Sequence, residues 1–298
     1  MTPLPPLSAA TFAALTATLV AVWAPRVWPS PRAWSWWLLP FLVTLVLAQA
    51  GGLVTTAGLV TLFVLVGACR VAATVPHGAL KGFALSVVLA VSAGILAHVL
   101  PGFENPRVLD AVRISPEAAP YTRYLNLDKG LLGLFLLTLV SPRQAIRRSR
   151  LPVAALVPPF VLAAAIVTIA TLAAGYVRWD PKLPGWWPTW LWSMAFLTAL
   201  PEEAVFRHLV QGGLQTWLGT STRAHWTAIA ASGLLFGAAH AGGGWTYVAL
   251  ATLAGAGYGW IYALSGSLTA SIAAHAALNL LHFTCFTYPA LASAVPGA

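Results

Sequence analysis

Long apolar stretches, separated by short polar segments, dominate this chain of 298 residues. They cover 9–23, 34–50, 53–68, 80–100, 130–140, 153–176, 186–218, 226–239, 247–264 and 268–286. A helix needs about 20 apolar residues to cross the hydrocarbon core of a bilayer. In lipid, backbone polar groups must be satisfied within the chain, which favours helices for such stretches. The sequence therefore predicts an all-α polytopic membrane bundle of about eight or nine transmembrane helices, with 130–140 as a short segment.

The charge pattern agrees with a membrane location. Only 8% of the residues are charged, against about 25% in a typical soluble domain. The formal net charge is +9, but the basic residues fall in short loops, where a positive-inside bias explains them better than nucleic-acid binding does. The clearest cluster is Arg143, Arg147, Arg148 and Arg150. We expect the lipid bilayer as a partner, no nucleic acid and, from the Arg- and Ala-rich composition, a bacterial inner (cell) membrane.

The chain divides into two parts near residue 150. Residues 1–150 are mostly featureless apolar segments, interrupted by a long loop at 101–129 that holds four acidic residues. Residues 151–298 concentrate polar side chains within apolar stretches, and they also hold two GxxxG pairs, Gly233 with Gly237 and Gly255 with Gly259. Small residues at that spacing let helices pack closely in lipid. We therefore predict an N-terminal transmembrane region and a C-terminal helix bundle that carries the chemistry.

Glu202, Glu203 and Arg207 form a group of three charges inside the predicted span 186–218. An intramembrane charge costs about 2.5–3.5 kcal/mol even on mild scales, which makes it a candidate functional residue. Glu203 and Arg207 are four residues apart, so on an α-helix they share a face and can pair. Glu202 points about 100° away and needs a partner from another helix. Pro201 suits a first helical turn, so we expect a kink or a helix start there.

Two further pairs have the same spacing, Phe236 with His240 and His275 with Asn279. Each pair alone is explained by packing or by interhelical hydrogen bonds. Together with Glu202 they place a carboxylate, two imidazoles and an amide in three spans. A carboxylate in an apolar chamber can act as a general base, and His and Asn side chains can stabilise an oxyanion. The set fits amide hydrolysis within the membrane. It also resembles a weak metal set of two His and a Glu, but the HExxH arrangement is absent and Asn is a poor zinc ligand.

At these residues the chain resembles the CPBP family of intramembrane proteases, also called the ABI family. This family includes type II CAAX prenyl proteases and bacteriocin-processing and immunity proteins. Its motifs EExxxR, FxxxH and HxxxN stand here as EEAVFR at 202–207, FGAAH at 236–240 and HAALN at 275–279. The resemblance covers about 185–285, and NLDK at 126–129 is similar to a stretch ahead of the core in some bacterial members.

The resemblance implies an intramembrane endopeptidase of the glutamic type, historically called a metalloprotease. Glu202 would activate water with help from His240, while His275 and Asn279 would stabilise the oxyanion. Three residues would support them: Glu203, Arg207 and Phe236. No cofactor is expected, although zinc stays open, and the substrate would be a membrane-associated protein or peptide.

Two other functions are compatible with the same residues. Intramembrane acids and histidines also mark proton pathways, so a proton-coupled transporter-like protein is one alternative. The inverted repeats typical of many transporters are not evident in the sequence. A non-catalytic immunity or binding membrane protein of the same fold is the other alternative.

Overall fold

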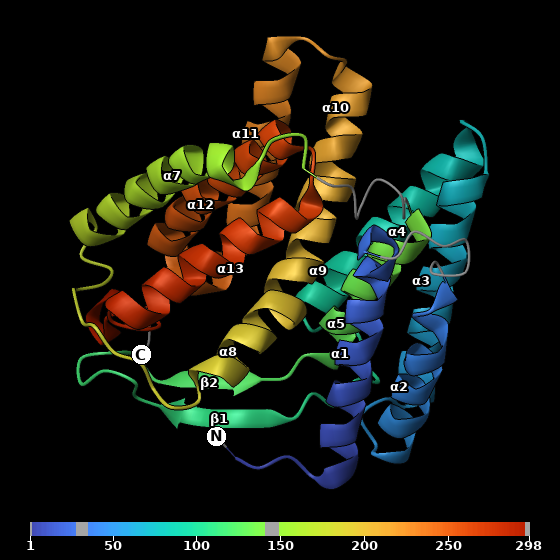
Figure 1. The fold of residues 1–298 in the computed structure, drawn as a ribbon, viewed down its shortest axis with the longest axis horizontal. Coiled ribbons are helices and arrows are strands. Elements are labelled where there is room, and N and C mark those ends of the chain that lie inside the picture. Colours follow the sequence, from blue (N-terminus) through green and yellow to red (C-terminus); the bar gives the residue numbers. More distant parts are fainter. Residues whose placement is uncertain (1, 28–34, 141–148, 296–298) are drawn as a thin grey trace. The chain divides into compact units, whose positions relative to one another are not determined.

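The structure is a computed structural model that describes residues 2–27, 35–140 and 149–295. Arg143, Arg147 and Arg148 of the predicted basic cluster lie outside these residues. The first helices are α1 (Pro6–Val27), α2 (Leu38–Ala50), α3 (Thr56–Thr74), α4 (Ala79–Leu96) and α5 (Leu127–Phe135), which the π-helix η2 (Leu136–Val140) continues. The later helices are α7 (Val153–Ala173), α8 (Trp187–Met194), α9 (Leu200–Glu203), α10 (Gly212–Leu218), α11 (Thr222–Ala238), α12 (Gly244–Ser265) and α13 (Leu268–Cys285) (Figure 1). Short 3₁₀ turns lie at η5 (Ala241–Gly243) and η6 (Ala292–Ala294).

Each predicted apolar stretch overlaps one or more of these helices, so the helical membrane fold is confirmed. Among the described residues, five helices are long and apolar enough to cross a membrane: Thr56–Thr74, Ala79–Leu96, Val153–Ala173, Ala241–Ser265 and Leu268–Cys285. Two apolar helical segments are shorter: Pro6–Val22, which is part of α1, and Leu38–Ala50, which is α2. The total of eight or nine spans therefore stays a prediction.

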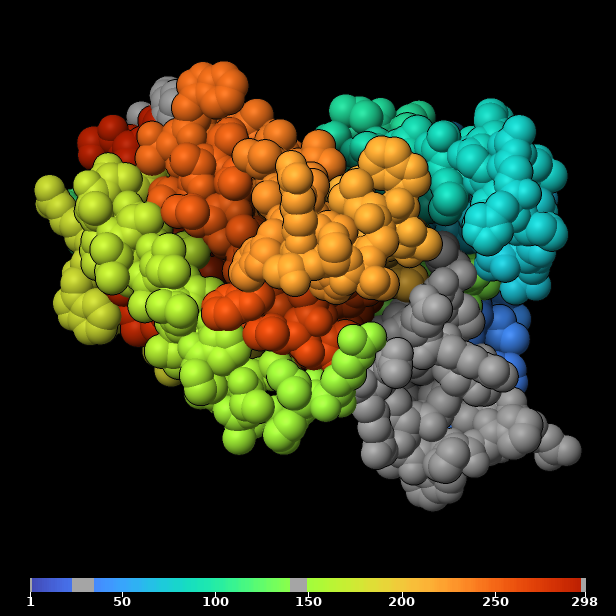
Figure 2. Space-filling view, turned by 90° about the horizontal axis from the view of Figure 1, so that it is seen from above, coloured from blue at the N-terminus to red at the C-terminus, as the bar shows by residue number. Residues whose placement is uncertain are grey.

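The surface of α7 shows what surrounds such a helix. Only 11% of its span is buried, and large apolar side chains such as Val153 and Ile169 are 79% and 66% exposed. Figure 2 shows α7, in yellow-green, at the surface. Exposing so many apolar side chains to water would be unfavourable, and a helix surface of this kind is normally covered by lipid.

The predicted loop at 101–129 contains regular structure. Two strands, β1 (Arg107–Val112) and β2 (Tyr121–Tyr124), pair in a small sheet. In β2, Tyr121 and Arg123 are buried while their neighbours are exposed, which is the two-residue alternation of a strand. Trp190 Nε1 donates to Tyr121 Oη at 3.2 Å, and Arg123 donates to Ser193 Oγ at 3.0 Å. These hydrogen bonds anchor α8, where the continuous helical run 187–218 begins.

The chain forms two compact units. Unit 1 comprises Met1–Val108, Tyr124–Ile146 and Phe196–Val205, and unit 2 comprises Leu109–Arg123, Arg147–Ala195 and Phe206–Ala298. Within unit 1, α1 packs on α2, α3 packs on α4, and α5 contacts α1, α4 and α9. Within unit 2, α12 is central and packs on α7, α11 and α13. The predicted division of function at residue 150 stays a prediction.

Candidate functional site

Glu202 and Glu203 lie on α9 in unit 1, where their side chains are 9% and 0% exposed. Of the two predicted alternatives at Pro201, a kink or a helix start, the helix start is wrong, because residues 187–218 are helical throughout. Pro201 is accommodated by π-helical winding on both sides, in η3 (Ala195–Ala199) and η4 (Ala204–Gln211). Wider winding changes the hydrogen-bond pattern from i→i+4 to i→i+5, which relieves the missing N–H and the ring clash of an internal proline. π-helical segments of this kind often occur at functional sites.

The π-helical winding affects the predicted pair of Glu203 and Arg207. Arg207 belongs to unit 2 and lies within the π-helix η4. Residues four apart share a face on an α-helix, but π-helical winding shifts that register towards five. The four-residue spacing alone therefore does not establish the pair, and the pairing stays a prediction.

Arg207 is held by polar and aromatic contacts within unit 2. Its side chain is 0% exposed, and Nη1 donates a hydrogen bond to Ser232 Oγ at 2.9 Å. Ser232 in turn donates to the backbone oxygen of Phe206 at 2.7 Å, so one buried hydroxyl joins α11 to η4. The Arg207 Cζ atom lies 5.4 Å from the centre of the Phe236 ring, within the range of a cation–π contact.

Phe236 is the centre of an aromatic cluster, which consists of Phe236, His240, Tyr258 and His275. The Phe236 ring centre lies 4.6 Å from that of His240, 5.7 Å from that of His275 and 6.0 Å from that of Tyr258. The His275 ring is stacked on the Tyr258 ring at 4.5 Å, with 12° between their planes. The FxxxH and HxxxN motifs therefore meet at the contact between α11, α12 and α13.

The hydrogen bond of His240 defines its tautomer. His240 Nδ1 lies 2.7 Å from the backbone oxygen of Phe236. A carbonyl oxygen only accepts, so Nδ1 carries the proton, and in the neutral ring Nε2 is then an acceptor. An imidazole held in this way can accept a hydrogen bond from a water molecule.

Asn279 follows His275 by one helical turn on α13. Its Nδ2 donates to the sulfur of Met194 on α8 at 3.1 Å. The sulfur of Met is a weak acceptor, so a stronger one, such as an oxyanion, would compete well for this amide. Within the described residues, no group of three His, Cys, Asp or Glu side chains is close enough to hold a metal ion.

In unit 2, Arg207 thus contacts the aromatic cluster through Phe236, and the cluster contains both His240 and His275. Asn279 lies one turn further along α13. In this apolar bundle the His275 imidazole and the Arg207 guanidinium are buried and the His240 imidazole is half-buried, and a buried glutamate pair precedes them along the chain. Residues 184–281 match the family model described as type II CAAX prenyl endopeptidase Rce1-like. This match confirms the resemblance and places the segment, which contains all three motifs, in the CPBP and CAAX protease family.

The family match supports a hydrolase, namely a CAAX-type protease that is integral to the membrane and acts on a membrane-associated protein. No curated protein and no solved structure matches the chain.

Three residues of this region are absent from the sequence prediction. Ser232 and Gln211 are both 0% exposed, and Gln211 Nε2 donates to the backbone oxygen of Gly259 at 2.9 Å. Tyr258 is the third residue, at 4% exposure. Each is an isolated polar side chain in an apolar helix, and that is the signal that could have identified it. Single Ser and Tyr residues are nevertheless frequent in membrane helices, because they can bond to their own backbone or face the interface.

Proposed function

We propose that this protein is an intramembrane endopeptidase that hydrolyses a peptide bond of a membrane-associated protein or peptide with a glutamate-activated water. The clustering of His240 and His275 around Phe236 carries the proposal, because a half-buried and a buried imidazole from separate parts of the chain contact the same ring. The EExxxR motif precedes both histidines within the matched segment, which supports the proposal further.

The proposed reaction uses four side chains. Glu202 takes a proton from a water molecule, assisted by Nε2 of His240, while the water oxygen attacks the carbonyl carbon of the substrate. The oxyanion that forms accepts hydrogen bonds from His275 and the Asn279 amide. The proton held by Glu202 then passes to the amide nitrogen as the C–N bond breaks, so no covalent acyl-enzyme is formed.

We further propose that the reaction needs no metal. Zinc sites of hydrolases use three strong protein ligands; with Glu202 acting as the general base, two histidines remain, and the asparagine amide of the third motif is a poor zinc ligand. A buried glutamate can do the work of a general base by itself. The membrane would be a bacterial inner membrane, in keeping with the Arg- and Ala-rich composition.

The test compares protein termini in membranes from cells that express the wild type or Glu202→Gln. New termini near the membrane-embedded part of a protein should appear only with the wild type. Glu117→Gln is the matched control, because the Glu117 side chain is 61% exposed and pairs with Arg178 at 2.7 Å. Identical termini with wild type and Glu202→Gln, at equal expression, would refute the proposal.

A further inference from the structure

Tyr258 is a close aromatic neighbour of His275. Their ring centres are 4.5 Å apart and their planes differ by 12°, whereas Phe236 meets the His275 ring edge-on at 5.7 Å and 76°. Both Tyr258 and His275 are buried, at 4% and 3% exposure. The His275 imidazole therefore lies parallel to the Tyr258 ring and nearly perpendicular to the Phe236 ring.

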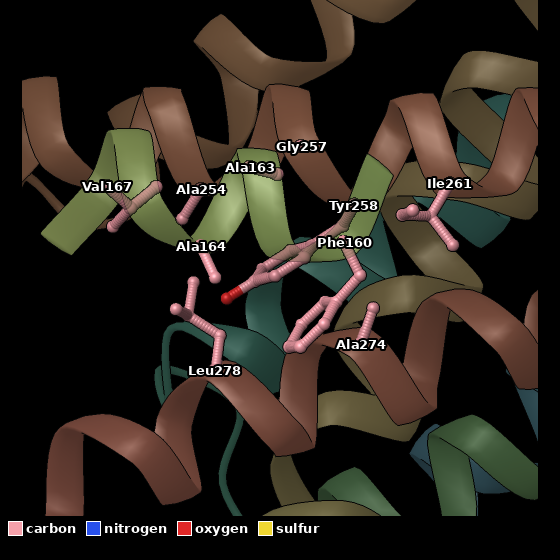
Figure 3. Close-up of a pocket in the computed structure, with 10 residues that line it drawn as sticks. All are labelled: Phe160, Ala163, Ala164, Val167, Ala254, Gly257, Tyr258, Ile261, Ala274 and Leu278. Atoms are coloured by element: carbon pink, nitrogen blue, oxygen red, sulfur yellow. The ribbon is translucent and has the colours of Figure 1, made fainter. Parts of the chain in front are cut away.

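The structure also fixes Tyr258 itself. Ser271 Oγ donates to the backbone oxygen of Tyr258 at 3.1 Å, and this hydrogen bond joins α12 to α13 one turn before His275. The Tyr258 ring also lines an apolar crevice between α7, α12 and α13. Figure 3 shows its hydroxyl end directed towards Ala164 and Leu278. A hydrogen bond from α13 thus ties the Tyr258 backbone, and the ring on which His275 is stacked lies at the crevice between α7, α12 and α13.

We propose that Tyr258 is a positioning residue for His275, and this role rests on the proposed function. A stacked ring prevents the imidazole from tilting, so the N–H that His275 offers to the oxyanion keeps its direction. Because an oxyanion forms only during the reaction, loss of this alignment should lower kcat and leave KM nearly unchanged. The aromatic ring carries the effect, and the hydroxyl group does not.

The geometry can be tested without a substrate. The full-length protein, labelled with ¹³C-histidine and held in lipid nanodiscs, gives ring resonances for its 7 histidines. The resonance that disappears in His275→Gln belongs to His275, and the Tyr258 ring should shift it upfield. Tyr258→Phe should keep that shift, while Tyr258→Leu and Tyr258→Met should lose it. Tyr262→Leu, the same change one turn along α12, is the matched control and should leave the resonance in place.

Activity provides the second measurement, with a substrate identified from the mapped termini. We expect kcat to fall about ten- to a hundredfold in Tyr258→Leu or Tyr258→Met, less than for complete loss of an oxyanion donor. Tyr258→Phe and Tyr262→Leu should stay near wild type. Tyr258→Met retains volume without a ring, so it serves if Tyr258→Leu does not fold.

The two measurements separate the possible failures. An unchanged His275 resonance in Tyr258→Met would refute the stacking, and a changed resonance with unchanged kcat would refute the positioning role. A wild type that cleaves nothing, with the ring shift intact, would instead refute the proposed function and the role that rests on it.

Discussion

The buried hydroxyl of Ser232 offers a quantitative test of how Arg207 is held. Ser232 accepts a hydrogen bond from Arg207 Nη1 at 2.9 Å and donates one to the Phe206 backbone oxygen at 2.7 Å. Ser232→Ala removes both hydrogen bonds without adding volume. We expect it to lower the free energy of unfolding because the Arg207 group that loses this acceptor is fully buried.

The expected magnitude follows from the kind of hydrogen bond that is lost. A hydrogen bond to a charged group contributes about 1.5–3 kcal/mol, and a neutral one about 1 kcal/mol. Hydrogen bonds measured within membrane helices are weaker, at about 0.6 kcal/mol on average and about 1.7 kcal/mol at most. For two bonds, one of them to a guanidinium, we expect a loss of about 2–3 kcal/mol.

Ser92→Ala is the matched control. Ser92 is also 0% exposed in an apolar helix, but it donates only to the Val88 backbone oxygen of its own helix, at 2.6 Å. That oxygen keeps its place in the helix after the change, so we expect a loss of less than about 1 kcal/mol. Reversible unfolding of both variants in mixed micelles measures the difference. A Ser232→Ala variant no less stable than Ser92→Ala would refute the role given to the Ser232 hydroxyl.

Three further predictions concern the glutamate pair, the need for a metal and the pH dependence of stability. Glu203→Ala should reduce the yield of folded protein, while Glu202→Gln should keep the yield and lose activity; equal yields with equal loss of activity would contradict this division of roles. Activity should survive dialysis against a strong chelator, and restoration by zinc after chelation would contradict a metal-free reaction. The Ser115 hydroxyl and then Lys182 hold the pKa of Asp180 below its usual value, against the opposing effect of burial. Its contribution to stability should therefore be complete above the usual Asp pKa and be lost as the pH falls through the lowered value; acid unfolding curves of wild type and Asp180→Asn that coincide would contradict this.

The helices could be predicted from the sequence because lipid leaves the backbone few choices. Apolar stretches such as 153–176 must satisfy their own hydrogen bonds, and a helix does so within the segment. The loop at 101–129 has no such constraint, so its strands depend on partners elsewhere in the chain, such as Trp190 and Ser193. These partners are far away in the sequence, and no local pattern identifies them.

The motif residues could be predicted for a similar reason, whereas their supporting contacts could not. A histidine or glutamate in an apolar span is conspicuous because its burial is costly. Tyr258 and Ser232 cost little to bury and are therefore inconspicuous, and their roles depend on which helices adjoin α12 and α11. The π-helical winding around Pro201 is equally hidden in the sequence, since an internal proline is compatible with a kink, a helix start or a change of winding.

The two GxxxG pairs show how one sequence pattern can have two structural effects. On α11, a Cβ added at Gly233 would lie 3.1 Å from the backbone nitrogen of Ala256, so this pair lets two helix backbones approach, as the pattern predicts. On α12, a Cβ at Gly255 would lie 3.0 Å from the Phe236 side chain, and one at Gly259 would lie 3.3 Å from Arg207 Nη1. The second pair therefore makes room for side chains of the candidate site. Helix packing and site geometry consequently depend on the same residues, and a methyl group at Gly255 would displace the ring that both histidines contact.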